Sequence, residues 1–268
     1  HALSMYIGVI FYFGSPRAVV IASHTSGHYF SLTAFIVCLF YILWNVAVMT
    51  TSAWNAVALL GLSPMWSILW TFLLTWERAP LHTFVAASVT FSCGLAIFVS
   101  SRASARSEES LLGDLLALIA GMTFGLYLTV CTEASTKHPD GSLMGAIAAG
   151  ATITVIASYM LVDGNLLQDC FPHGGLQGYS WPIADGVLET LHILLVTIAT
   201  KHCPSAVVGL FLIVDLIIEP YLVWTVFGER PLLTTIAAGG ILCVTLAAHE
   251  LAAFHHESEK ARHDSYQR

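Results

Sequence analysis

The chain has 268 residues, of which 56% are hydrophobic and 10% charged, and its mean hydropathy is +0.76. This composition excludes an ordinary soluble domain and predicts an all-α, polytopic integral membrane protein. The formal net charge is −7, and the ten Lys and Arg residues form no basic stripe, which argues against nucleic-acid binding. The six cysteines occur singly and in no CxxC motif, so neither a disulfide framework nor a zinc site is expected.

Long apolar runs recur from one end of the chain to the other. A run of about 18 to 22 residues is as long as a helix that crosses a hydrocarbon core of about 30 Å. We predict nine membrane spans, of which the first ends near residue 13 and the others are 31–49, 54–75, 81–100, 111–132, 142–162, 181–200, 205–227 and 232–253. Ser63-Pro64 predicts a kink inside the third span. The charged tail, residues 254–268, is expected to be solvated and mobile.

Two similar polar turns interrupt the apolar runs, one at Glu77-Arg78 and the other at Glu229-Arg230. Each places an acidic and a basic residue close to a proline where a span begins, so the two charges can cap that helix start and neutralise each other. The turns are 229 − 77 = 152 positions apart, and the same offset carries the turn at 50–53 onto 202–205 without a gap. Turns that recur at one constant offset indicate that the chain contains two copies of one unit.

The first copy is expected to cover residues 1–100 and the second residues 111–253. Because 111 − 152 = −41, the intact first copy should begin roughly 40 residues before His1, which would give ten spans in two units of five. An odd number of spans per unit makes the units enter the membrane from opposite sides. The sequence therefore predicts two inverted five-helix repeats, an arrangement found in many secondary transporters.

The basic residues of the loops predict the orientation, since Lys and Arg are enriched on the cytoplasmic side. One side collects Arg17, Arg78, Lys137, Lys201, Lys260, Arg262 and Arg268, and the other collects Arg102, Arg106 and Arg230. The C-terminus is accordingly expected in the cytoplasm. The Glu77 turn would then lie inside, and the Glu229 turn and the long loop 163–180 would lie outside.

Three motifs resemble the drug/metabolite transporter superfamily of EamA type. They are Leu62-Ser63-Pro64 followed by Trp76-Glu77-Arg78, then Gly113-Asp114-Leu115-Leu116-Ala117-Leu118, and then Phe227-Gly228-Glu229-Arg230-Pro231. The resemblance covers roughly residues 31–253 and implies one truncated and one complete five-helix unit. It also implies transport of metabolites, amino acids, nucleotide sugars or drugs, without choosing among them. The second half departs from the usual pattern, with Leu216 where Pro is expected and Pro220 one turn later.

Ionisable residues inside the predicted spans are the candidate binding residues, because each costs about 2.5–3.5 kcal/mol to insert. Asp185, Glu189 and His192 fall at i, i+4 and i+7, on one stripe of a helix. Asp215 and Glu219 fall at i and i+4 on the next span. Counted at ~1.5 Å per residue, Glu189 and Glu219 both lie roughly 11 Å below the outer surface.

Facing carboxylates at one depth would suit proton coupling or a cationic or amino-bearing solute. The plainer interpretation of the same residues is a buried polar cluster that fixes helix packing. Asn45, with Tyr41 and Trp44, could line the opposite wall, although an interhelical hydrogen bond is the better explanation of Asn45. Glu189 and His192 also form a Glu-x-x-His motif, but no second copy exists, so neither a metal nor another cofactor is expected.

The sequence therefore predicts a secondary transporter of a small metabolite or drug-like solute, with protons as a second substrate, and no enzymatic activity. Its other expected partners are the lipid bilayer and, in a homodimer, a second copy of the chain. A nucleotide-sugar or phosphometabolite exchanger of the same fold is the first alternative. It is disfavoured because Lys and Arg occur only at span ends, away from a buried phosphate site. A non-transporting membrane protein or a membrane-embedded enzyme is the second alternative.

Overall fold

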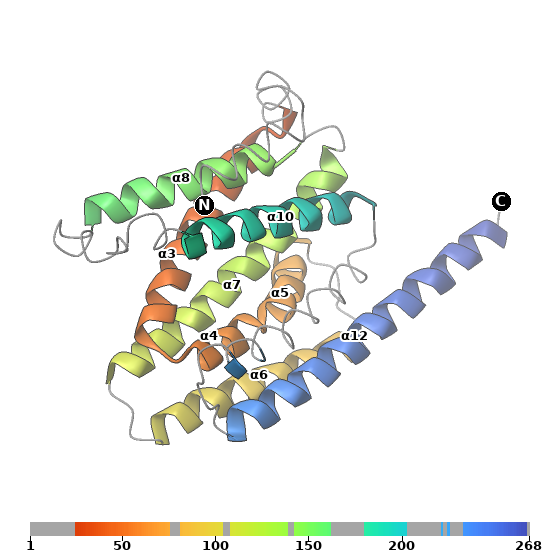
Figure 1. The fold of residues 1–268 in the computed structure, drawn as a ribbon. Helices are drawn as coiled ribbons and strands as arrows, with labels where there is room; N and C mark the ends of the chain where they lie inside the picture. The colour runs from red at the N-terminus through yellow and green to blue at the C-terminus, as the bar shows by residue number, and fades with distance from the viewer. Residues whose placement is uncertain are drawn as a thin grey trace. The chain divides into compact units, whose positions relative to one another are not determined.

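The computed structural model describes residues 25–75, 81–103, 108–138, 142–161, 180–202, 221, 224–225 and 233–266. Within these ranges the chain is all-helical and forms no strand (Figure 1). The helices are α3 (His28–Thr50), α4 (Ala53–Leu60), α5 (Ser63–Thr75), α6 (Leu81–Ala103), α7 (Glu108–Lys137), α8 (Met144–Leu161), α10 (Ser180–His202) and α12 (Leu233–Tyr266). The predicted first span, most of the span at 205–227 and both Glu-Arg turns lie outside the described residues.

Three segments of the described chain are long and apolar enough to cross a membrane. They are His28–Thr50, Asn55–Leu74 and Leu111–Lys137, with mean hydropathies of 2.2, 1.8 and 1.9. Helices of this length and composition are the standard solution in a bilayer, because a helix satisfies its own backbone hydrogen bonds where no water is present.

Two predicted boundaries are wrong. Residues 133–137, expected in a loop, form the last turn of α7, where Lys137 Nζ lies 2.7 Å from Glu133 Oε1. Residues 254–266, expected to be a mobile tail, continue α12 to Tyr266. The tail contains a run of good helix formers, Glu259-Lys260-Ala261-Arg262, and no Gly or Pro, so the helix does not have to end where the apolar run ends.

The predicted kink at Ser63-Pro64 is a complete break between α4 and α5. The Gly61 N–H still donates to the Val57 carbonyl at 2.9 Å, and α5 starts two residues later. Pro64 is the second residue of α5, in the first turn, where its missing N–H has no helical partner to lose. The single predicted span is therefore built from two helices.

The described residues belong to two compact units, and each is described separately. Unit 1 comprises His1–Ile42 and Val130–His202, and unit 2 comprises Leu43–Thr129 and Cys203–Arg268. The divisions fall inside α3 and α7, so both helices contribute to both units.

In unit 1, α8 approaches the first part of α3 at backbone distance. A Cβ built on Gly150 would lie 2.6 Å from the Ala34 carbonyl oxygen and 2.8 Å from Val37 Cβ. One turn further along α8, the Thr154 hydroxyl donates to the Cys38 carbonyl at 3.4 Å. Glycine at position 150 is thus what allows this close packing.

In unit 2, small residues recur every fourth position along one face of α7, at Gly113, Ala117, Gly121 and Gly125. A Cβ on each glycine would lie within 3.0 Å of the α3–α4 turn, α4 or α5, respectively. Hydrogen bonds reinforce the contact with α5, where Trp70 Nε1 donates to the Met122 carbonyl at 3.0 Å. Close backbone approach through small residues is a common way for helices to associate in lipid.

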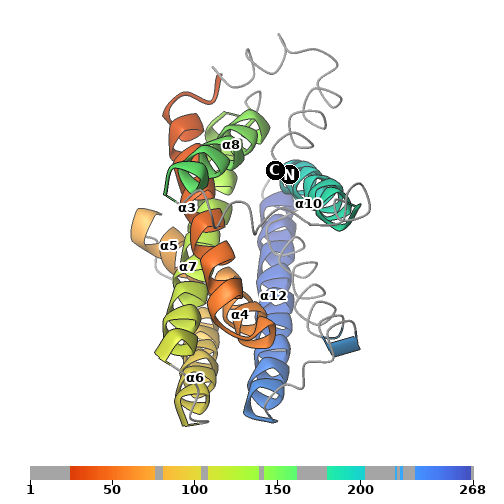
Figure 2. The ribbon, with the colours of Figure 1, turned by 60° about the vertical axis from the view of Figure 1, so that its left-hand side comes forward.

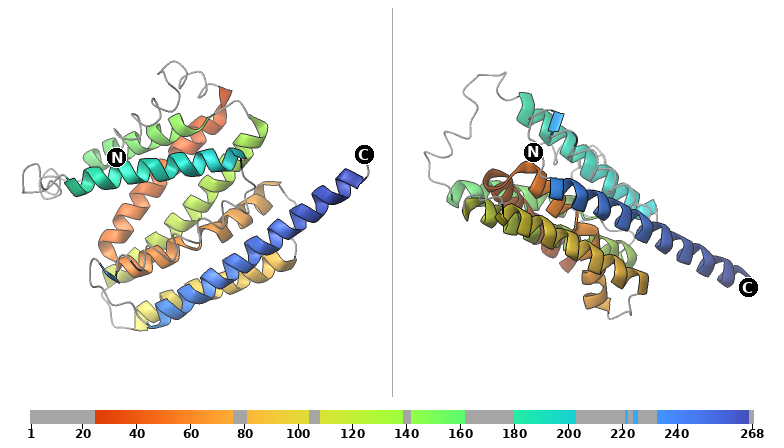
Figure 3. Two further views of the ribbon diagram at one scale, coloured as in Figure 1. Left: turned by 45° about the vertical axis from the view of Figure 1, so that its right-hand side comes forward. Right: turned by 90° about the horizontal axis from the view of Figure 1, so that it is seen from below.

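The second long contact in unit 2 is between α6 and α12, which lie side by side (Figures 2 and 3). The hydroxyl groups of Ser100, near the end of α6, and Thr234, near the start of α12, are hydrogen-bonded. The two helices are therefore antiparallel. Ala86 from α6 and Ala238 from α12 are both buried in the apolar core of this unit.

Two glycines, Gly125 in α7 and Gly239 in α12, predict opposite effects of the same substitution. Gly125→Ala would place a methyl group 2.7 Å from the Ser63 carbonyl oxygen, so we expect a loss of about 1–3 kcal/mol through overpacking. Gly239→Ala, with no atom within 4 Å of the new Cβ, should leave stability unchanged or raise it. Thermal unfolding in detergent measures both, and a Gly125→Ala variant as stable as Gly239→Ala would contradict the close contact.

Candidate functional site

A polar cluster in unit 1 joins α3 to α10. The Tyr41 hydroxyl donates to Glu189 Oε1 at 3.5 Å, the outer limit of a hydrogen bond. The other carboxylate oxygen, Oε2, lies 3.7 Å from His192 Nδ1 on the next turn of α10. The Glu189 and His192 side chains are 36% and 40% exposed, so the cluster is only partly screened from its surroundings.

The cluster lies near the middle of both helices. Glu189 is the tenth residue of the 23-residue α10, and Tyr41 is the tenth residue from the end of the 23-residue α3. A carboxylate, an imidazole and a phenol at this depth can together hold a proton or the amino group of a solute. They can equally act as a polar contact that fixes α10 on α3.

The remaining predicted site residues are not brought together by the described chain. Asp215 and Glu219 lie outside the described residues, as do Glu77, Arg78, Glu229 and Arg230. Asn45 lies on an exposed position of α3, in the part of that helix assigned to unit 2. The proposed pairing of Glu189 with Glu219 therefore stays a prediction.

The sequence did not single out Asp114 as a site residue, although it is fully buried at the start of α7. Its Oδ1 accepts a hydrogen bond from Asn55 Nδ2 at 3.2 Å and another from the Thr51 hydroxyl. Its Oδ2 is buried and has no hydrogen-bond partner. Asn55 is in the first turn of α4, where the helix dipole also favours a negative group. Asp114 thus holds the α3–α4 turn against α7.

One signal in the sequence could have indicated this role. Gly113 immediately precedes Asp114, and a Cβ on Gly113 would lie 2.7 Å from the backbone nitrogen of Thr51. A glycine that allows backbone contact places the next side chain against the same turn. The sequence analysis instead placed Gly113-Asp114 at the opening of the span 111–132, as part of a motif that resembles a known family.

The described residues contain no group of three or more His, Cys, Asp or Glu side chains placed to hold a metal ion.

Comparison with known proteins gives a likeness of fold only. No family model matches the chain, and no curated protein matches it. One solved structure, described only as "Crystal structure of protein", is 15% identical with a TM-score of 0.50. The match covers 92% of this chain and 95% of the other. At this identity the likeness says nothing about a substrate.

Asp114 yields a prediction about stability. Asp114→Ala leaves the buried Asn55 amide and the Thr51 hydroxyl without their acceptor, so we expect a loss of about 1–3 kcal/mol. Asp114→Asn keeps a carbonyl acceptor and should lose clearly less. Thermal unfolding compares the two, with Glu133→Ala in the Glu133–Lys137 pair of α7 as the control. Equal losses for Ala and Asn would show that the acceptor does not hold the turn.

Proposed function

We propose that the chain is a secondary transporter that moves a small solute across a membrane by alternating access between two inverted repeats. The observation that carries the proposal is the contact between Tyr41 and Glu189 near the middles of α3 and α10. In transporters with inverted repeats, the binding site lies near the midplane of the bilayer, where equivalent parts of the two repeats meet.

The helix bounds support the equivalence of α3 and α10. Both bounds differ by the offset of the two Glu-Arg turns, since 180 − 28 = 152 and 202 − 50 = 152. The starts of α6 and α12 differ by the same number, because 233 − 81 = 152. The antiparallel course of α6 and α12 is also what inverted repeats require of equivalent helices.

The chemistry of the cluster favours protons or a cationic or amino-bearing solute. A carboxylate inside a bilayer is costly unless a proton or cation neutralises it, and Glu189 has a phenol and an imidazole on its two oxygens. A nucleotide-sugar exchanger would instead need cationic side chains facing the phosphates. Membership of the EamA-type superfamily, implied by the resemblance of the motifs, is part of this proposal.

Substitution of Glu189 tests the transport function. Proteoliposomes with an imposed pH gradient are offered a defined panel of amino acids, polyamines and organic cations, and uptake is measured by mass spectrometry. Glu189→Gln removes an ionic acceptor worth about 1.5–3 kcal/mol, so gradient-driven uptake should fall by about tenfold or more. Tyr41→Phe removes a neutral hydrogen bond and should reduce uptake by only about two- to tenfold.

Glu133→Gln serves as the matched control for charge, because Glu133 pairs with Lys137 near the end of α7 and should not affect uptake. Uptake that depends on the gradient but is unchanged in Glu189→Gln would contradict the proposed site. If no compound in the panel enters faster than into protein-free vesicles, transport of these solute classes is contradicted.

Inversion of the repeats is tested independently by accessibility. Single cysteines replace His28, Ser180 or His202 in a chain without its six native cysteines, and an impermeant maleimide is applied to sealed vesicles. Inversion predicts that positions 28 and 180, which start equivalent helices, react from opposite sides. Position 202, at the other end of α10, should react from the same side as position 28. Reaction of positions 28 and 180 from one side would contradict inverted repeats.

A further inference from the structure

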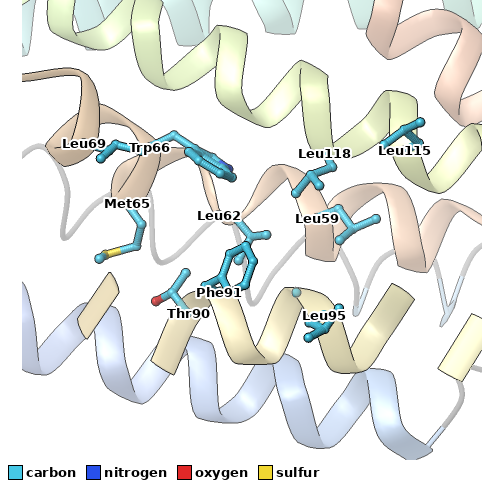
Figure 4. Close-up of a pocket in the computed structure, with 11 residues that line it drawn as sticks. Leu59, Leu62, Met65, Trp66, Leu69, Thr90, Phe91, Leu95, Leu115 and Leu118 are labelled. Carbon is cyan, nitrogen blue, oxygen red and sulfur yellow. The ribbon is translucent and has the colours of Figure 1, made fainter. Parts of the chain in front are cut away.

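Unit 2 contains a cavity of about 370 Å³ between the α4–α5 segment, α6 and α7 (Figure 4). Leu62 from the α4–α5 break and Phe91 from α6 lie close together in its lining, and Leu118 contributes from α7. The cavity is partly open to the surroundings of the chain. Its volume falls within the range of small-molecule sites, about 300–1,000 Å³, so it has room for a ligand.

The lining presents almost no polar surface. Thr90 and Trp66 are the two lining residues with an oxygen or nitrogen atom in the side chain, and both of these atoms are themselves buried. The accessible lining is formed almost entirely by the carbon and sulfur atoms of Leu, Met and aromatic side chains. An ordered water needs two to four polar partners, and apolar cavities stay dry or take up apolar ligands. The lining therefore excludes water, ions and polar solutes as the main occupant.

The cavity follows the length of the α4–α5 segment. Its lining residues recur there at every third or fourth position, at Leu59, Leu62, Met65 and Leu69. At ~1.5 Å per residue, the distance from Leu59 to Leu69 along this segment is roughly 15 Å. Figure 4 shows Leu69 and Leu115 at opposite ends of the lining. The space is therefore elongated, and it fits a flexible chain better than a compact molecule.

The open side of the cavity borders segments that are able to cross a membrane. Leu69 belongs to Asn55–Leu74 and Leu115 belongs to Leu111–Lys137, and both segments are long and apolar enough to span a bilayer. The two side chains line the cavity and are nevertheless 42% and 43% exposed. Exposed apolar side chains of membrane-spanning helices face the hydrocarbon tails of lipids. A hydrocarbon chain can therefore reach the cavity sideways, without crossing water.

We propose that this cavity binds one hydrocarbon chain of a membrane lipid, which enters from the bilayer. Lipid tails are as apolar as leucine, so burial of apolar surface alone gives a chain little reason to leave the bilayer. Packing supplies the driving force, because side chains around an empty space lack dispersion contacts that a hydrocarbon chain restores. The proposal concerns residues of unit 2 alone and does not depend on the transport function or on the Glu189 cluster.

Quenching of tryptophan fluorescence tests the proposal, because Trp66 lines the cavity. The full chain in mild detergent is titrated with a phosphatidylcholine that carries bromine atoms midway along one acyl chain. Bromine quenches an indole only at short range, so a lipid chain in the cavity should quench Trp66, and the quenching should saturate at one lipid per protein chain. Trp66→Phe keeps an apolar ring in the lining and should remove the saturable part of the quenching.

Larger side chains in the lining should exclude the lipid. Leu118→Phe extends an α7 side chain into the cavity, and we expect the saturable binding to weaken by about tenfold or more through overpacking. Leu115→Phe, at an exposed position of the same lining, is a second variant that should fold normally and also weaken binding. Leu112→Phe is the matched control, because Leu112 lies on α7, is 53% exposed and is outside the lining.

Exchange of the headgroup distinguishes a chain-binding cavity from a charged surface site. Phosphatidylglycerol with the same brominated chain should give the same saturable quenching, because the lining contains no charged side chain. A clear dependence of the affinity on the headgroup would assign binding to surface charges and overturn the proposal. The absence of saturable quenching would also overturn it, as would saturable quenching that persists in Trp66→Phe, persists in both Leu118→Phe and Leu115→Phe, or is lost equally in Leu112→Phe.

Discussion

The packing of unit 2 depends on how closely the backbone of α7 approaches its neighbours. In a bilayer, burial of apolar surface gives little advantage to one helix pair over another, because lipid tails are as apolar as leucine. What remains is close packing and hydrogen bonding across the contact. Gly113, Gly121 and Gly125 allow both, since each lies against backbone atoms of the α3–α4 turn, α4 or α5. The hydrogen bonds of Asp114 and Trp70 are made possible by the same approach.

The helices of this fold could largely be predicted from hydropathy, because the bilayer sets both their length and their backbone conformation. Their ends could not. Hydropathy indicates where a helix leaves the apolar layer. The helix itself continues as long as its residues favour helix, so α7 ends at Lys137 and α12 at Tyr266. The break at Gly61 was predicted as a kink because Pro64 alone does not show whether the preceding turn also opens.

Residue spacing singled out two side chains that lie close together in the structure, but it did not reveal contacts formed between distant segments. Glu189 and His192 stand out as ionisable residues one turn apart in an apolar run, and Tyr41 was predicted on a facing wall. Asp114 was not recognised as a site residue, because its burial results from a turn more than fifty residues earlier in the chain and the preceding Gly113 is the only local sign of that contact. The cavity left no signal either. Leucines that line it have the same helical spacing as leucines that face lipid.

The proposed duplication concerns the helices and does not extend to the candidate binding residues. Under the 152-position offset, Glu189 corresponds to Val37 and His192 to Phe40, and both of these are buried. Val37 packs against Gly150 of α8, so in α3 this stripe serves helix packing. In α10 the same stripe carries Glu189 and His192, whose side chains lie 3.7 Å apart. Under the proposed function, the repeated scaffold supplies two halves for alternating access, and the single charged stripe supplies one binding site. Under the proposed duplication, this asymmetry explains why the turns and the helix bounds match at one offset while few residues do.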